Sequence, residues 1–248
     1  MRVALLGHGR MGRAVEERAR ALGDEIGLVR GSRDAAAGGD LAAWLRGHDV
    51  AIDFSSAAAV PAHAAACTAA RVPLVEGTTG WRDREAEVRR LVEQGGGTML
   101  YAANFSPGVY LFFRLVARAG ELFRGLADYE AFIEEAHHAR KRDAPSGTAL
   151  TLRDLLATTG GRTAPIASTR AGHIPGTHRV GFDSAADQIV LEHSARSRDG
   201  FAVGALLAAR WVIGKRGVFA FEDVVDEVLA LSRTTGSGEG VARPSGAA

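Results

Sequence analysis

The sequence predicts an α/β protein in two parts: a parallel sheet covered by helices, followed by an α+β domain. Two observations support the first part, since short aliphatic runs alternate with alanine-rich helical patterns and a glycine-rich turn directly follows the first run. A third observation marks the change of architecture, because apolar residues recur at helical spacing over a long stretch after residue 108. The 248 residues suffice for two modest domains, and an apolar fraction of 46% can form a core in each.

In the first part, strands and helices are expected to alternate, as in a parallel sheet whose connections cross over its faces. The five expected strands are Val3 to Leu6, Ile26 to Val29, Val50 to Phe54, Pro73 to Val75 and Thr98 to Ala102. The helices between them are Arg13 to Leu22, Leu41 to Arg46, Ala59 to Ala70 and Asp83 to Glu93.

The second part is expected to start at residue 107, where Val109, Phe112, Phe113 and Val116 mark a long amphipathic helix. Its later elements are a strand at Tyr129 to Glu135, a helix from Ser146 to Thr158, strands between Ala164 and His193, and a helix from Phe201 to Ile213. Residues 234–248 are rich in glycine, serine and alanine without apolar periodicity, which predicts a flexible tail.

Charge and cysteine content exclude several classes of protein. Thirty basic and twenty-nine acidic residues leave a formal charge of +1, which favours neither a nucleic-acid partner nor an anionic membrane surface. The single cysteine, Cys67, cannot form an internal disulfide, and the chain opens without a signal-peptide pattern, so a cytoplasmic location is expected. No apolar run reaches the roughly 20 residues that a membrane-spanning helix needs.

The turn Gly7-His8-Gly9-Arg10-Met11-Gly12 leaves a strand and opens a helix, which is the context of a Rossmann-like dinucleotide site. Free N–H groups at the start of such a helix hold a pyrophosphate, and glycines let the backbone approach it. A tight turn with incidental glycines is the alternative interpretation. After the second strand, Arg33 or Arg30 would suit a 2′-phosphate, which favours NADPH slightly over NADH, although Asp34 is adjacent and a surface arginine without a ligand fits equally well.

Two more turns follow strands at the edge where parallel sheets bind their ligands. They are Gly77-Thr78-Thr79 and Ala102-Ala103-Asn104-Phe105. Their small, hydroxyl and amide side chains could contact ribose, phosphate or the nicotinamide carboxamide. Taken one at a time, each turn is also explained by ordinary turn chemistry.

The segment from Glu134 to Thr148 concentrates proton donors and cations. If the strand ends near Glu135, then His137, His138, Lys141 and Arg142 lie on a loop before the next helix. An imidazole and an ammonium group can both supply protons. A metal site is the competing interpretation, but adjacent histidines point in different directions and no third ligand has suitable spacing, so no metal is expected.

The start of that next helix predicts an anion site. Free N–H groups at Gly147 and Thr148, the hydroxyls of Ser146 and Thr148, and the Lys141 ammonium could converge on a substrate carboxylate. A solvated basic loop before a capped helix remains the alternative.

These residues resemble the dihydrodipicolinate reductase family, also called 4-hydroxy-tetrahydrodipicolinate reductases, of lysine and diaminopimelate biosynthesis. The most specific likeness runs from Glu135-Ala136-His137-His138 through Lys141 to Asp143-Ala144-Pro145-Ser146-Gly147-Thr148-Ala149. Supporting motifs in the family's order are Gly9-Arg10-Met11-Gly12, Asp53-Phe54-Ser55, Gly77-Thr78-Thr79-Gly80, Ala102 to Ser106, and His193 through Phe201 to Ala205.

The resemblance implies a nicotinamide-nucleotide domain of residues 1–106, rejoined by 215–233, and a substrate-binding domain of residues 107–214 that assembles a homotetramer. It implies that His137 transfers a proton, that Lys141 is the second proton donor, and that His138, Lys141, Gly147 and Thr148 hold a small dicarboxylate. The implied activity is the NAD(P)H-dependent reduction of 4-hydroxy-tetrahydrodipicolinate to tetrahydrodipicolinate.

Three rival interpretations remain open at this point. Another two-domain NAD(P)-dependent amino-acid or imine dehydrogenase would share the nucleotide turn but lack the segment from His137 to Lys141. A dinucleotide-sensing regulator would bind the cofactor without turnover. A structural or interaction protein would carry the glycines by chance.

Overall fold

A computed structural model of the chain describes residues 1–31 and 39–235, with side chains up to residue 230. The chain divides into two compact units, and each is described by itself. Residues 1–103 form the first unit together with the chain from Ala205 on, and Asn104–Gly204 form the second.

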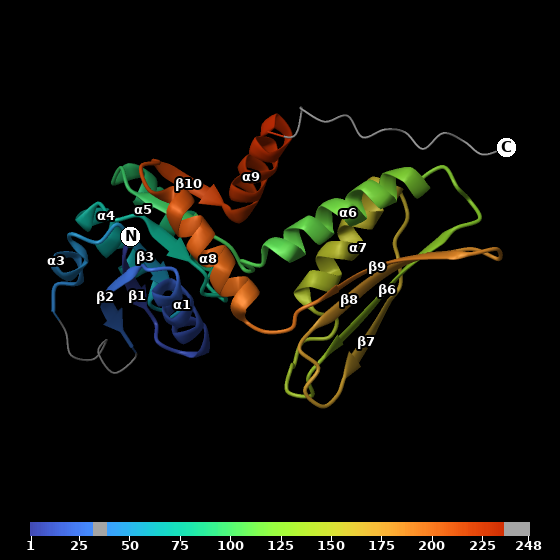
Figure 1. The fold of residues 1–248 in the computed structure, drawn as a ribbon, viewed down its shortest axis with the longest axis horizontal. Helices are drawn as coiled ribbons and strands as arrows, with labels where there is room; N and C mark the ends of the chain where they lie inside the picture. The colour runs from blue at the N-terminus through green and yellow to red at the C-terminus, as the bar shows by residue number, and fades with distance from the viewer. Residues whose placement is uncertain (32–38, 236–248) are drawn as a thin grey trace. The chain divides into compact units, whose positions relative to one another are not determined.

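The first unit contains, within its described part, a six-stranded parallel sheet (Figure 1). Its strands are β1 (Arg2–Leu6), β2 (Glu25–Arg30), β3 (Val50–Asp53), β4 (Leu74–Glu76), β5 (Thr98–Tyr101) and β10 (Gly217–Ala220). Their order is β10-β5-β4-β3-β1-β2, so the chain reverses its direction across the sheet between β1 and β3. In such sheets ligands bind at the carboxyl edge beside this reversal.

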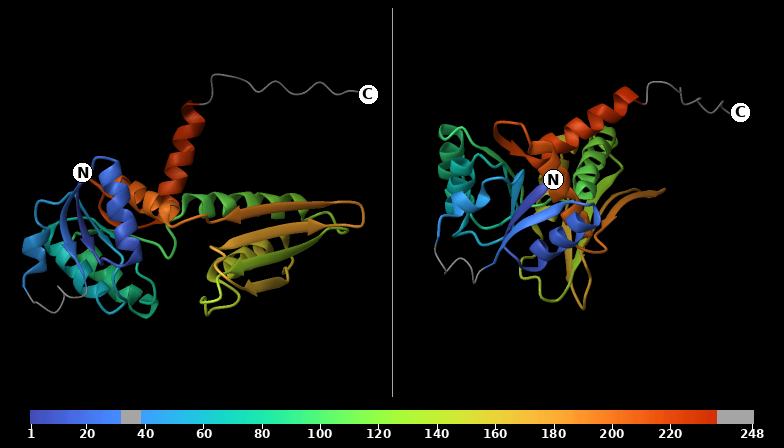
Figure 2. Two further views of the ribbon diagram at one scale, coloured as in Figure 1. Left: turned by 60° about the horizontal axis from the view of Figure 1, so that its bottom comes forward. Right: turned by 60° about the vertical axis from the view of Figure 1, so that its left-hand side comes forward.

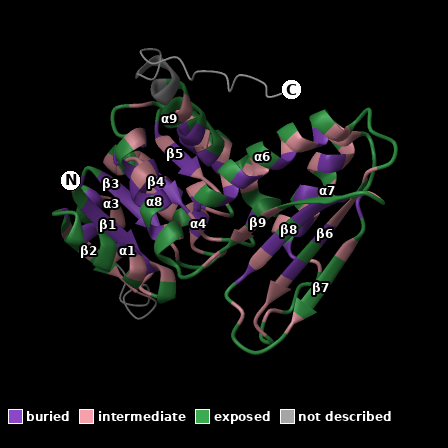
Figure 3. Ribbon diagram, turned by 45° about the vertical axis from the view of Figure 1, so that its right-hand side comes forward, coloured by how far each residue is buried: buried purple, intermediate pink, exposed green. Residues whose placement is uncertain are grey.

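Helices cover both faces of this sheet. They are α1 (Arg10–Ala21), α3 (Leu41–Leu45), α4 (Val60–Ala70), α5 (Glu85–Gln94), α8 (Asp199–Val212) and α9 (Phe221–Thr235), with a short 3₁₀ helix, η1 (Arg82–Arg84), before α5. Ala4, Leu6 and Met99 pack against Val60 and Val88, so α4 and α5 lie on one face. Figure 3 shows the buried strands between the helical layers.

The second unit is a four-stranded sheet with two helices on one face (Figure 2). Its elements are α6 (Pro107–Phe123), β6 (Glu130–His137), α7 (Gly147–Gly160), β7 (Ile166–Arg170), β8 (Thr177–Asp183) and β9 (Gln188–Ser194), and the strand order is β7-β6-β8-β9. Ile133 and Val180 are paired in register and pack against Phe112 and Leu152 of the helices. Since strand residues alternate between faces, their sequence neighbours point to the opposite face.

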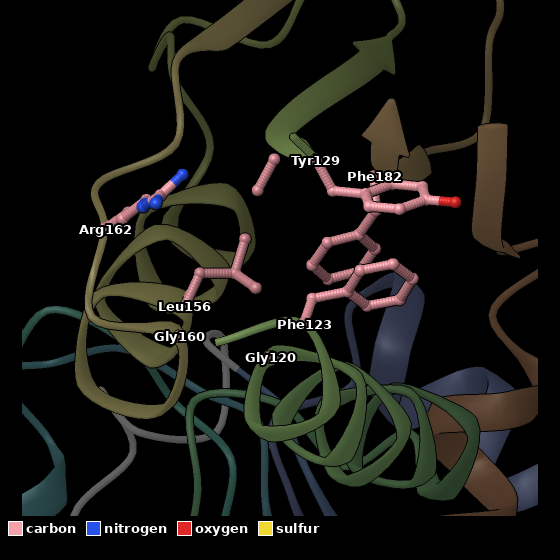
Figure 4. A pocket seen from close by; sticks show the side chains of 8 residues that line it. Gly120, Phe123, Tyr129, Leu156, Gly160, Arg162 and Phe182 are labelled. Atoms are coloured by element: carbon pink, nitrogen blue, oxygen red, sulfur yellow. The ribbon is translucent and has the colours of Figure 1, made fainter. Parts of the chain in front are cut away.

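The two helices approach closely where glycine replaces a side chain. A Cβ atom at Gly120 would lie 2.3 Å from Thr159 Oγ1, so only glycine fits between α6 and α7. A pocket opens beside this contact (Figure 4). It is lined by Gly120, Phe123, Tyr129, Ala131, Leu156, Gly160, Arg162 and Phe182. The stacked rings of Phe123 and Phe182, 4.3 Å apart, make this pocket mainly apolar, and its lining holds no group of proton donors suited to chemistry.

The sequence predicted the order of helices and strands, and the five strands expected in the first part are β1 to β5. A sixth strand that joins the same sheet was not predicted. The sixth strand, β10, has only four residues, begins at a glycine with a φ of 114° and lies at the sheet edge, so its sequence carries little periodicity. The predicted second domain reached residue 214, whereas the second unit ends at Gly204 because the rest of α8 packs with the first unit. The predicted flexible tail lies almost entirely beyond the described residues. None of the helices in residues 1–31 and 39–235 is both long and apolar enough to cross a bilayer.

Candidate active site

Three turns meet at the carboxyl edge of the first sheet. Gly7, after β1, has a φ of +93°, and a Cβ atom there would lie 2.4 Å from the carbonyl oxygen of Phe54. Gly77, after β4, packs against the ring of the same Phe54. A Cβ atom at Gly77 would lie 2.1 Å from this ring. The structure therefore brings together the turns that follow β1, β3 and β4.

The first turn of α1 can hold an anion. Gly9 precedes the helix, and this described turn contains neither a capping side-chain hydrogen bond nor an acidic residue. A Cβ atom at Gly9 would meet nothing within 4 Å, whereas one at Gly12 would lie 2.1 Å from the Gly7 carbonyl oxygen. The space beside Gly9 is thus open, and the backbone at Gly7 and Gly12 is tightly packed. This cradle fits a pyrophosphate.

The other predicted cofactor residues with described positions are His8, Thr78, Thr79, Ala102, Ala103, Asn104 and Phe105. His8 already contacts Glu16 of α1, with 2.7 Å between Nε2 and Oε2. Asn104 and Phe105 belong to the second unit. Arg33 lies outside the described residues, so the prediction that rests on it stays a prediction.

Two buried carboxyl groups organise this edge, and sequence reasoning had not assigned either to the site. Asp53 and Glu76 are paired in register on β3 and β4, and both are fully buried. Asp53 accepts the N–H of Ser55 at 2.8 Å and lies 2.6 Å from His63 Nδ1, while Glu76 accepts the N–H of Thr78 at 2.6 Å. Burial raises the pKa of Glu76 well above its usual range, and the charge of Asp53 acts in the same direction.

The remaining predicted site residues lie at one end of the sheet in the second unit. β6 continues to His137, which pairs with Arg170 of β7. The prediction that the strand ends near Glu135 and leaves His137 on a loop was therefore wrong, because β7 supplies partners for two more residues. Alternation along β6 places Glu135 and His137 on the same helix-covered face as Ile133.

Glu135 is buried and accepts hydrogen bonds from several neighbouring residues. Arg170 Nη1 and Nη2 donate to its two oxygens at 2.9 and 2.7 Å, and the Ser146 N–H donates at 3.3 Å. His137 Nδ1 lies 2.5 Å from Oε2. Burial alone would raise the pKa of Glu135, but hydrogen bonds from Arg170, Ser168 and His137 hold this pKa at about 2. The carboxylate is ionised at neutral pH.

The surroundings of His137 act on the pKa of its imidazole in both directions, and the net effect is to lower it. Burial lowers the pKa of His137, while the hydrogen bond to Glu135 raises it. The ring of His178 lies 5.1 Å away in an edge-to-face arrangement, and burial lowers the pKa of His178 to about 4. A Cβ atom at Gly176 would lie 3.2 Å from His137 Nε2, so glycine leaves space beside that nitrogen.

Ser146 anchors the helix that follows. Its Oγ accepts the N–H of Ala149 at 3.2 Å and lies 2.9 Å from His178 Nε2. Because its own N–H binds Glu135 and the residue is buried, both polar groups of Ser146 are used inside the protein. This arrangement favours a capping role for Ser146 over direct contact with a ligand.

Lys141 and the start of α7 lie nearer to solvent. Lys141 Nζ donates to Asp143 Oδ2 at 2.8 Å. Gly147 and Thr148 begin α7, and the first N–H groups of a helix have no partner within it. His138 has a buried Nδ1 that lacks a partner among the described residues. These donors can bind an anion such as a carboxylate.

Glu135, His137 and His178 also lie close enough together to hold a metal ion, with ligand atoms within 4.8 Å of one another. The surrounding charge argues against this use. Both oxygens of Glu135 are engaged by the Arg170 guanidinium, which would repel a cation at the same carboxylate. The arrangement is better suited to proton transfer.

Comparison with known proteins identifies the family. Residues 1–105 match the model of the dihydrodipicolinate reductase N-terminus, and residues 108–225 match that of its C-terminus. The chain belongs to this reductase family. A 4-hydroxy-tetrahydrodipicolinate reductase from Christiangramia forsetii is 38% identical over 92% of this chain and 99% of its own. One from Xylella fastidiosa is 43% identical over 71% of this chain and 73% of its own.

A solved reductase has the same fold. It is the dipicolinate-bound dihydrodipicolinate reductase from Paenisporosarcina sp. TG-14, with a TM-score of 0.75 and 21% identity over 89% of this chain and 97% of that one. At this identity the likeness concerns the fold alone.

Sequence reasoning had not singled out Arg170 or His178 in this member of the reductase family. Both lie in the region that was predicted only as strand-rich. Alternation with Ile166 would have placed Arg170 on the inward face of its strand, which is unusual for an arginine. The sequence does not reveal that this strand lies beside β6.

Proposed function

We propose that the protein is the NAD(P)H-dependent reductase that converts 4-hydroxy-tetrahydrodipicolinate to tetrahydrodipicolinate in lysine and diaminopimelate biosynthesis. The observation that carries this proposal is the site around His137, in a chain that belongs to the reductase family. A neutral imidazole with one nitrogen held by a carboxylate and space beside the other is suited to moving a proton.

The substrate is a small dicarboxylate, which needs several donors. We assign its carboxylates to the N–H groups of Gly147 and Thr148, the Lys141 ammonium and His138. Lys141 would exchange its present partner, Asp143, for the substrate. Charge-assisted hydrogen bonds of this kind are among the stronger polar contacts.

The cofactor would lie at the carboxyl edge of the first sheet. The open space before Gly9 and the backbone packing of Gly7 and Gly12 fit a pyrophosphate, with Arg10 and Met11 supplying N–H groups. A nicotinamide cofactor supplies the hydride for this reduction. NADPH is weakly favoured over NADH through Arg33, and both remain candidates.

Loss of water from 4-hydroxy-tetrahydrodipicolinate would give a conjugated ring imine. Hydride would then add at the carbon that carried the hydroxyl group, and the resulting enamine requires a proton at the neighbouring carbon. His137 is the candidate donor: its neutral ring would first take up a proton at Nε2 from solvent and then pass that proton on, directly or through water. Lys141 is the second candidate. Glu135 contacts both His137 and the Ser146 N–H, and these hydrogen bonds hold the two ends of the segment that carries His137 and Lys141.

We further propose a homotetramer in the cytoplasm. The sheet face opposite α6 and α7 carries Phe132, packed over Gly181, and Val190, which is 43% exposed. These residues form an apolar patch beside the ion pairs of Arg179 with Glu134 and Glu192, and an exposed apolar patch favours association between copies of the chain. A monomer in light scattering would contradict this assembly.

The test follows the absorbance of NADH and NADPH separately while an upstream synthase makes the unstable substrate from pyruvate and aspartate semialdehyde. We expect substrate-dependent oxidation, and a decrease in kcat of about a hundredfold or more in His137→Gln. His173→Gln, which changes an exposed histidine, is the matched control.

Two outcomes would support a rival function, and a third would change the role assigned to His137. Cofactor binding without oxidation would support a sensing regulator, and oxidation of an amino acid in the reverse direction would support another dehydrogenase. Full turnover of His137→Gln with an unchanged pH profile would remove His137 from the mechanism.

A further inference from the structure

Arg170 is held beside His137 by hydrogen bonds from its two terminal nitrogens. Its two terminal nitrogens donate to both oxygens of Glu135 at 2.9 and 2.7 Å. The same nitrogens donate to the carbonyl oxygens of Thr169 and Asp143 at 2.8 and 2.6 Å. Arg170 is thus fixed by four hydrogen bonds, and it reaches the segment that carries Lys141.

The fixed carboxylate determines which nitrogen of His137 carries the proton in the neutral ring. Glu135 is ionised and can only accept, so the 2.5 Å contact requires a proton on His137 Nδ1. The neutral imidazole then has its lone pair on Nε2, on the side where Gly176 leaves space. Only Nε2 can exchange a proton with a ligand.

A carboxylate alone would also hold the imidazole in its charged form, which would make it a poor base for the next cycle. The guanidinium of Arg170 compensates the carboxylate charge without interrupting the hydrogen bond to His137. The other titratable groups that face His137 are His178 from β8 and Lys141 from the loop after β6, and the Lys141 charge also opposes a charged imidazole.

We propose that Arg170 and Glu135 form a charge-compensated pair that positions His137, so that Glu135 fixes its tautomer and Arg170 keeps the ring able to both give and take a proton. Arg170 and Glu135 are positioning residues, since they act through His137. Their role in turnover rests on the proposed function, whereas their effect on the His137 ring does not.

The first experiment measures the tautomer and titration of His137 by NMR in the folded, substrate-free protein. In Glu135→Gln, Arg170 is left uncompensated, so we expect the pKa of His137 to fall and its Nδ1 tautomer to be less strictly populated. In Arg170→Met, Glu135 is left uncompensated, so we expect the pKa of His137 to rise. Opposite shifts are expected if the carboxylate and the guanidinium act on His137 in opposite directions.

The matched controls are Arg118→Met and Glu121→Gln. These residues form an exposed ion pair on α6, with 2.8 Å between Nη1 and Oε2, and neither should move the His137 titration. Arg170→Lys keeps a positive charge but not the planar fork, so it should keep the His137 pKa close to that of the native protein if Arg170→Met does not fold.

The second experiment follows kcat against pH. Glu135→Gln should lower kcat by about tenfold or more at neutral pH, with the substrate KM little changed, and should move the limb assigned to His137 toward acid. Arg170→Met should move the same limb toward alkali.

Shifts in the same direction, or no shift in Glu135→Gln, would overturn the proposed compensation. If the native protein showed no turnover but the NMR shifts were opposite, the proposed function would fail while the action of the pair on His137 would stand. Turnover with unmoved NMR shifts would reject the pair and leave the function intact.

Discussion

Glu76 in the first unit and Glu135 in the second are two buried glutamates whose pKa values are shifted in opposite directions. Each lies at or near the carboxyl end of a strand, and both are almost fully buried. Burial raises the pKa of Glu76 well above its usual range, whereas hydrogen bonds overcome burial at Glu135 and hold its pKa at about 2.

The register of the neighbouring strand explains the difference. In the first sheet, β3 places a second carboxyl group, Asp53, directly opposite Glu76. In the second sheet, β7 places Ser168 opposite Glu135 and Arg170 two residues further along, on the same face. Burial acts in the same direction on both glutamates, so the residues that the next strand presents account for the opposite net pKa shifts.

The two glutamates also make opposite contributions to stability as pH changes. Glu135 has a lowered folded-state pKa, so its contribution is present above its ordinary pKa of 4.5 and is lost as pH falls toward about 2. Glu76 has a raised pKa, so its contribution is complete below 4.5 and is lost as pH rises through the folded-state value.

The largest effect is expected from removing the cation that distinguishes the two sites. Arg170→Met leaves Glu135 buried without its ion-pair partner, which should lower the free energy of unfolding by about 3 to 5 kcal/mol at neutral pH. Hydrogen exchange of peptides from β6 and β7 measures this loss in the second unit. Unchanged protection there would show that the guanidinium does not stabilise the carboxylate.

A smaller effect, of opposite sign, is expected from Glu76→Gln. Glutamine has the shape of the protonated acid and cannot ionise, so it should stabilise the first unit by on the order of 1 to 2 kcal/mol at pH 8. The gain should vanish near pH 4, where Glu76 is protonated in both the folded and unfolded states. Tryptophan fluorescence follows this unit, because Trp81 donates to the Thr78 carbonyl at 2.8 Å. A gain that did not depend on pH would point to packing instead of ionisation.

The smallest effect is expected at an exposed pair of the same charges. Arg118 and Glu121 are 68% and 52% exposed, so Arg118→Met should change the free energy of unfolding by less than about 0.5 kcal/mol. Urea denaturation of Arg118→Met and of Arg170→Met gives the free energy of unfolding of each variant. The difference between them shows how much more stability is lost when the arginine is buried. Equal losses would mean that burial makes no difference.

Local signals in the sequence predicted much of this molecule. The turn from Gly7 to Gly12 and the cap at Ser146 depend on residues a few positions apart, and the structure places both beside helix starts. His137 and Lys141 were found in the same way, from one short segment rich in donors. The predicted roles of these residues in binding and catalysis stay predictions.

The contacts that set the protonation of these groups could not be predicted, because they join residues from different strands. Arg170 reaches Glu135 across 35 residues of sequence, and Asp53 and Glu76 meet only through strand register. The end of β6 was misplaced for the same reason, since β7 extends it to His137. Sequence periodicity shows which face a residue occupies but not which strand lies next to it.

The late position of β10 in the sequence affects how the chain folds while it is being synthesised. β10 pairs with β5, and Thr98 Oγ1 donates to the Lys215 carbonyl across 117 residues. While the ribosome makes the intervening segment, the outer edge of β5 has no strand beside it, and the second unit is finished before that edge is covered. An open strand edge can pair with another chain. The nascent protein is therefore most exposed to aggregation during the interval in which its second unit emerges.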